Sequence, residues 1–211
     1  MTSPPDAERT QPPGLAEAVG GPLGIVETSL PAVAFVVAYV ASGSDTNTAA
    51  GVAVGLALVL SVARLVRRES PRHALSGLVG IAFAAFIATR SGRAEDFFLP
   101  GLLANAAYAS AFVISIAVRR PLVGLIVSQL DGEGGGWRAD PERVRAFTRA
   151  SWLWAGMFVL RLIVQLPLYL AGAVVALGIG RTAMGLPLFA LALWLTWRLV
   201  RRPHAPAPAA S

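Results

Sequence analysis

The sequence alternates long apolar stretches with short polar ones, at a spacing that predicts membrane-spanning helices. A helix needs about 20 apolar residues to cross roughly 30 Å of hydrocarbon. Six stretches come close to that length, and they are residues 23–42, 49–66, 74–89, 97–118, 150–170 and 182–200. The pattern therefore predicts an all-α fold, a polytopic membrane protein with a bundle of six transmembrane helices.

A seventh apolar stretch, residues 121–130, is too short to cross a bilayer. At this length both an interfacial helix and a re-entrant segment are compatible with the sequence. Residues 1–21 and 203–211 are rich in proline, and we expect them to be disordered tails on the cytoplasmic side. The predicted transmembrane domain is thus residues 22–202.

Pairs of arginines predict how the helices are oriented. The motif Val-Arg-Arg closes the second, fourth and sixth stretches, at residues 66–68, 118–120 and 200–202. Basic loops stay on the cytoplasmic side of a membrane, so both termini are expected in the cytoplasm and the protein in the inner (plasma) membrane. Two arginines in the predicted outer loop at residues 90–96 argue against this orientation, but the three pairs outweigh them.

The composition narrows the partners and the chemistry. Only 14% of the residues are charged, against about 25% in a typical soluble domain. The net charge of +6 comes from arginines clustered between apolar stretches, so the expected partner is the lipid bilayer and not nucleic acid. Membrane-protein partners and self-association remain open.

Metal sites and catalysis are not expected. The chain has no cysteine, and its only histidines are His73 and His204, so we expect no metal centre and no cofactor. It has no phosphate-binding glycine motif, and no pair of carboxylates shares a predicted level with a histidine in a pattern typical of catalysis. The sequence therefore predicts a protein that is not an enzyme.

The most informative residue is Arg161, which lies about 18 Å from the predicted cytoplasmic boundary. Facing lipid at that depth costs at least about 2.5–3.5 kcal/mol, so Arg161 is predicted to point inward. Gln165, one turn further on, shares its face. Asn105 lies at a matching depth in the fourth stretch and is the expected partner. Asp96 or Glu95 is expected to cap the cluster near Gln165.

A second polar layer is expected nearer the cytoplasm, formed by Glu27, His73 and Arg64. Two interpretations of the buried polar residues stay open. In the first they line a site for an ion or small solute, because an ionisable group inside the membrane is by default a functional candidate. In the second they only lock one helix to another.

Two further patterns concern the shape and packing of the helices. Leucine-proline pairs inside the apolar stretches predict kinked helices. Their prolines are Pro31, Pro100, Pro167 and Pro187. Small residues at helical spacing in the third stretch predict close packing against another helix, and not a pore. They are Ser76, Gly77, Gly80 and Ala84.

Four segments carry a resemblance to a known family: ETSLPAVAFVVAY, RHALSGLVG, SGRAEDFFLPGLLANAAY and WLWAGMFVLRLIVQLPLYL. Over residues 21–202 the chain resembles a family of actinobacterial multi-pass membrane proteins, domain of unknown function 3159, and the match to GRAEDFFLPG is specific. The resemblance implies a six-helix protein of the inner membrane and no particular activity. A distant similarity in size and helix count to intracellular septation proteins implies a role in the cell envelope.

Two functions follow as candidates. The first is a small-solute or ion transporter, or a subunit of one, with a polar site centred on Arg161. The alternative is a non-catalytic membrane scaffold or envelope-organisation protein, in which the same polar residues only lock the helix packing.

Overall fold

The computed structural model describes residues 21–67, 71–130 and 136–200. The described elements, in chain order, are α2 (Gly21–Ala41), α3 (Thr46–Val66), α4 (Pro71–Ser91), the 3₁₀ turn η1 (Ala94–Phe98), α5 (Leu99–Ala117), α6 (Leu122–Leu130), the 3₁₀ turn η2 (Gly136–Ala139), α7 (Pro141–Leu170), α8 (Val174–Ala183) and α9 (Leu186–Val200). No strand occurs in these ranges, which confirms the all-α prediction. The predicted tails lie outside the described residues.

Several helices are suited to a membrane. Four segments are long and apolar enough to cross one, namely Thr46–Val66, Ala94–Ala117, Pro141–Leu170 and Val174–Val200. Only 17–28% of the residues in their apolar windows are buried inside the protein, so apolar side chains cover much of its exterior. This surface indicates a membrane protein. The described apolar parts of α2 and α4 are shorter, and the count of six spans stays a prediction.

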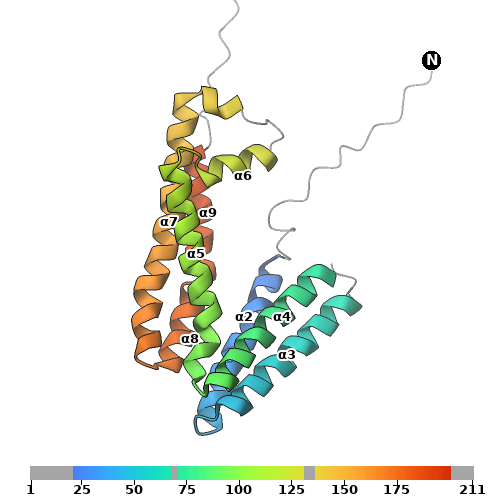
Figure 1. The fold of residues 1–211 in the computed structure, drawn as a ribbon. Coiled ribbons are helices and arrows are strands. Elements are labelled where there is room, and N and C mark those ends of the chain that lie inside the picture. Colours follow the sequence, from blue (N-terminus) through green and yellow to red (C-terminus); the bar gives the residue numbers. More distant parts are fainter. Residues whose placement is uncertain (1–20, 68–70, 131–135, 201–211) are drawn as a thin grey trace, which may run out of the picture.

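The helices form two groups that meet at one end. The first group is α2, α3 and α4, and the second is α5, α7, α8 and α9. Figure 1 shows the two groups converging near η1 and diverging towards α6. We call these the η1 end and the α6 end. Contacts between the groups run mainly from α2 to α8 and from η1 to α4, α7 and α8, so the groups are joined chiefly at the η1 end.

Three phenylalanines pack where the groups meet. Phe35 of α2 is completely buried, and its ring stacks on that of Phe97 with centroids 4.0 Å apart. Phe98 meets both rings edge-on. Leu177 of α8 is buried in the same cluster. We call Phe35, Phe97, Phe98 and Leu177 the aromatic seal, because it fills the η1 end with apolar side chains from both groups.

The helices α2 and α8 approach each other closely at Gly178. A Cβ atom added to Gly178 would lie 2.4 Å from Cγ2 of Val36, well inside van der Waals contact. Small residues allow this kind of close approach between membrane helices. The glycine therefore sets the distance between the two groups.

Replacing Gly178 by alanine is expected to lower the free energy of unfolding by about 1–3 kcal/mol, the usual cost of overpacking. Val36 is β-branched and has little freedom to move aside. Gly180→Ala is the matched control on the same helix, because its Cβ would lie 3.8 Å from Leu168, an ordinary contact. Thermal unfolding of the purified chain in detergent measures both variants. Equal midpoints for the two would contradict the close approach.

The short helix α6 is docked on the second group. Its first two free amides are bound by buried serines, since Leu122 N–H donates to Ser115 Oγ at 3.2 Å and Val123 N–H to Ser151 Oγ at 3.3 Å. Figure 1 shows α6 lying across the direction of α5 and not along it. The segment thus forms a short helix at the α6 end, packed chiefly against α7.

The prolines act in two different ways. Pro31 and Pro167 lie inside α2 and α7, as predicted. Pro100 and Pro187, however, lie in the first turns of α5 and α9, where a missing backbone N–H costs little. For these two the prediction of a kink inside a helix is wrong, because each helix begins immediately before the proline.

The last predicted span is interrupted. The helix expected over residues 182–200 begins at Leu186 as α9, and a separate helix that was not predicted, α8, precedes it and ends at Ala183. Pro187 explains the position of the break, because a proline ring clashes with the carbonyl four residues earlier, which here belongs to Ala183. The backbone at Met184 and Gly185 forms a turn between the two halves.

Candidate functional site

A cavity of about 570 Å³ lies between the two helix groups. Side chains from α2, α3 and α4 form one wall, and α5, α7 and α8 form the other. Phe97 of the aromatic seal lines it on the side of the η1 end. A volume of this size is typical of sites for small molecules.

Arg161 is the central residue of the second wall. It lies on α7, nine residues before the helix ends at Leu170, which places it about 14 Å from that end. Its Nη2 donates to the backbone carbonyls of Met184 at 2.7 Å and Gly185 at 2.9 Å. These carbonyls belong to the break between α8 and α9. Gly185 also accepts from the amide of Phe189 in α9, so the guanidinium supplies the donor that the interrupted helix lacks at Met184. It also stands at the negative end of the α8 dipole.

The expected partner of Arg161 was therefore wrong, although the expected neighbours are present. Among the described residues, no hydrogen bond joins Arg161 to Asn105. Asn105 and Gln165 nevertheless line the same cavity as Arg161. Gln165 is almost fully buried, and within the described part of the chain neither amide side chain makes a hydrogen bond. Both amides are thus open to a ligand in the cavity.

A second arginine, Arg181, shares the cavity and was not anticipated. It lies on α8, seven residues after the helix begins at Val174, and so about 11 Å from that end of the helix. Its guanidinium packs against the backbone at Gly101, where an added Cβ would meet Nη1 at 2.3 Å. It also lies 5.9 Å from the ring centroid of Phe98. In the described ranges Arg181 makes no hydrogen bond and no ion pair.

The remaining lining is of two kinds. Arg64 lines the cavity from α3, but the side chains of Glu27 and His73, the other members of the expected inner layer, lie outside the described residues. The small residues of α4 also line the cavity. Ala84 is buried in the core, but no described atom lies within 4 Å of a Cβ added to Gly77 or Gly80, so at these two glycines the predicted close packing is wrong.

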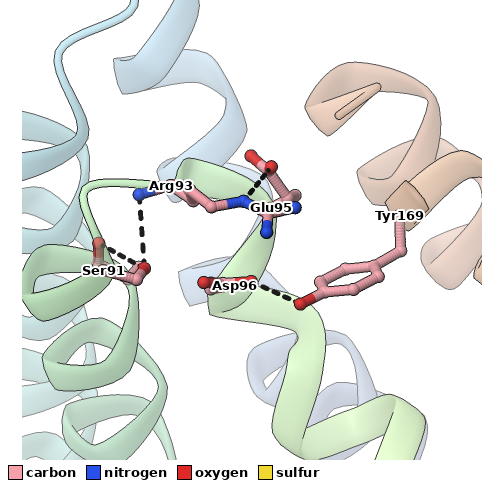
Figure 2. A network of polar contacts seen from close by, with 6 residues as sticks. Ser91, Arg93, Glu95, Asp96 and Tyr169 are labelled. Atoms are coloured by element: carbon pink, nitrogen blue, oxygen red, sulfur yellow. Dashed lines mark hydrogen bonds and ion pairs between the residues drawn. The ribbon is translucent and has the colours of Figure 1, made fainter. Parts of the chain in front are cut away.

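The acidic pair predicted for the site lies at the η1 end instead (Figure 2). Asp96 is buried and accepts a hydrogen bond from the Tyr169 hydroxyl, one turn beyond Gln165 on α7. Glu95 accepts from Nε of Arg93 at 2.8 Å. This hydrogen bond and the charge of Glu95 raise the pKa of the Arg93 guanidinium. Neither acid is among the described residues that line the cavity.

The contact between Asp96 and Tyr169 has a structural consequence. It ties η1, which follows the first group, to the end of α7 in the second group. The guanidinium of Arg93 lies 5.8 Å from the centroid of the Tyr169 ring and covers the same junction. Together with the aromatic seal, these contacts hold the η1 end closed.

A family model described as "Protein of unknown function (DUF3159)" matches residues 19–207. The chain belongs to this family. The match covers both helix groups and every residue named in the cavity, so the cavity is part of the family domain and not of an appended segment. No curated protein and no solved structure matches the chain.

The cavity offers positive charge and hydrogen-bond donors. Within the described part of the chain, no three His, Asp or Glu side chains gather closely enough to hold a metal ion. Two arginines and two amides point to a different chemistry, the binding of a polar or charged small molecule. A sequence signal for Arg181 did exist: the Gly-Leu-Pro at residues 185–187 interrupts a 27-residue apolar segment, and broken helices often carry binding sites.

Proposed function

We propose that the protein is a small-solute or ion transporter, or a subunit of one, and that the cavity between the two helix groups is its substrate site. It crosses the inner membrane six times, with both termini in the cytoplasm. The observation that carries this proposal is a polar cavity, halfway along the helices, with free side-chain donors and one closed end.

Depth supports the proposal. Arg161 lies about 14 Å, and Arg181 about 11 Å, from the η1 end of its helix. Half of a 30 Å hydrocarbon core is about 15 Å, so both guanidiniums stand near the middle of the bilayer. Substrate sites of secondary transporters occupy this level and are commonly built on interrupted helices. The break between α8 and α9 is such an interruption, and it lies beside both arginines.

A scaffold is the alternative, and one observation favours it. Arg161 holds the ends of α8 and α9 to α7, which is what a packing clasp does. A clasp does not account for Arg181, Asn105 and Gln165, whose side chains make no hydrogen bond within the described residues. Polar groups left unpaired at this depth are costly, and a scaffold gains nothing from them.

Access to the cavity from both sides of the membrane tests the proposal. The chain has no cysteine, so a single cysteine can be introduced at Ala104, which is exposed in the cavity. Vesicles of both orientations are treated with a membrane-impermeant maleimide. We expect the cysteine to be modified by reagent added on the α6 face. Reagent added on the η1 face should modify only the molecules whose cavity has opened to that side. Solute and ion profiles of a deletion strain identify candidate solutes. A transported solute should change the fraction of cysteine that is modified from the η1 face.

Leu103→Cys is the matched control. Its side chain is 61% exposed but is not part of the cavity lining, so it faces lipid and stays unmodified from both faces. A transporter must expose its site alternately to the two sides. If Ala104→Cys is reached from one face only with every candidate solute, and the deletion strain has an unchanged profile, the scaffold is correct.

A further inference from the structure

We propose that the cavity binds a small oxyanion, a phosphate, sulfate or carboxylate group, between Arg181 and Arg161. The inference deepens the proposed function and rests on it, because it names the chemical class of the substrate.

Arg181 carries most of the argument. Within the described ranges its guanidinium has no acceptor in the protein, and its nearest surroundings are the Gly101 backbone and the ring of Phe98. Arg181 is accessible from the cavity, and a guanidinium stays charged in proteins, so it keeps its charge at this depth of the membrane. In a bilayer such a charge needs a partner. A bound anion in the cavity supplies that partner.

The charges around the cavity favour an anion. Its described lining includes Arg64, Arg161 and Arg181 and no aspartate or glutamate. Arg64 has interactions of its own, whereas Arg161 and Arg181 line the same cavity and make no ion pair among the described residues. The acids Glu95 and Asp96 bond to Arg93 and Tyr169 at the η1 end. A cation entering this lining is repelled, whereas an anion relieves the repulsion between the two guanidiniums.

The available donors suit oxygen atoms. Arg161 uses Nη2 for the two carbonyls, which leaves its Nη1 without a hydrogen bond in the described part of the chain. The guanidinium N–H groups of Arg181 have no hydrogen-bond acceptor among the described residues, and the amides of Asn105 and Gln165 add further donors. A guanidinium fork binds two oxygens of one carboxylate or phosphate group at once. A spherical halide cannot use that geometry, which is why we infer an oxyanion.

Two sources offer this chemistry: a soluble oxyanion and the phosphate of an anionic lipid. The full-length chain is therefore reconstituted into nanodiscs of zwitterionic phosphatidylcholine, and its thermal unfolding is followed during titration with inorganic phosphate, sulfate or succinate. Sodium chloride at equal ionic strength is the reference. A second arm replaces part of the phosphatidylcholine by phosphatidylglycerol, with no added oxyanion.

The main variant is Arg181→Gln, which we expect to fold because Arg181 makes no hydrogen bond to the described protein. For the wild type we expect a saturable rise in the unfolding midpoint with at least one oxyanion. In Arg181→Gln the apparent dissociation constant rises by about tenfold to a hundredfold, as for loss of one charged hydrogen-bond donor. Arg181→Lys keeps the charge without the fork and should fall between. Arg198→Gln is the control, since Arg198 packs on Trp194 outside the cavity.

The outcomes separate the inference from the proposed function. If only phosphatidylglycerol stabilises the wild type, and Arg181→Gln removes the effect, the oxyanion site is upheld with a lipid as its source. If neither an oxyanion nor phosphatidylglycerol raises the unfolding midpoint more than chloride does, the site is refuted. It is also refuted if the rise persists in Arg181→Gln. Oxyanion binding without two-sided access at Ala104 refutes transport alone. Transport of a cation or neutral solute that survives in Arg181→Gln refutes the oxyanion alone.

Discussion

Replacing Arg161 by leucine is expected to lower the free energy of unfolding by about 1–3 kcal/mol, the cost of leaving the carbonyl of Met184 without a donor. The carbonyl of Gly185 also accepts from the amide of Phe189, whereas among the described residues Arg161 is the donor to the carbonyl of Met184. Leucine fills similar space but donates nothing. The measurement is thermal unfolding of the full-length chain in detergent, compared at equal concentration with the wild type.

Two further variants show whether the hydrogen bonds are responsible. Arg161→Lys retains a charged donor and is expected to recover part of the loss. Arg198→Leu removes an exposed arginine that packs on Trp194, and is expected to change the free energy by no more than about 0.5 kcal/mol. If Arg161→Leu unfolds at the same temperature as Arg198→Leu, the carbonyl contacts at the break contribute nothing to stability.

Replacing Phe35 by alanine is expected to cost about 3–5 kcal/mol, the range for a large buried aromatic side chain. Phe35 is completely buried and stacks on Phe97, so its removal leaves a hole between α2 and η1. Because these rings close the η1 end, the substitution also changes access. In the Ala104→Cys background, the cysteine should become more reactive towards a reagent added from the η1 face.

Phe83→Ala serves as the control for this substitution. Phe83 lies on α4 with 56% of its surface exposed, so its loss creates no cavity inside the protein. We expect neither the unfolding midpoint nor the reactivity at Ala104→Cys to change appreciably. A Phe35→Ala protein that is destabilised but equally closed would show that the aromatic seal supports packing and does not control access.

Sequence patterns predicted the helices well, for a simple physical reason. Long apolar stretches have few alternatives to helix when water cannot satisfy the backbone. The start of α7 has a local cause that the sequence carries, because Asp140 followed by Pro141 suits a helix N-terminus, and Asp140 accepts from the amides of Glu142 and Arg143. Burial of Gln165 near Arg161 followed from helical periodicity alone.

The contacts of the polar residues were harder to predict. Depth along a helix places Arg161 and Asn105 at one level, but it does not tell which backbone carbonyls are free to accept. The partner of Arg161 depends on the break at Met184 and Gly185, which arises from Pro187 on a neighbouring helix. Arg181 was missed because residues 171–181 lie between two predicted spans and no helix was predicted there, whereas the structure has α8.

Division of the last span into α8 and α9 also bears on how the protein moves. The half that ends at Ala183 touches α2 and η1 as well as α7, whereas the other half touches α7 and α8. A rocking motion of the first three helices can therefore carry α8 along while α9 stays in place. The bending is then concentrated at Met184 and Gly185, whose carbonyls are both bound by Arg161. A ligand that binds the Arg161 guanidinium would therefore also change the flexibility of the connection between α8 and α9.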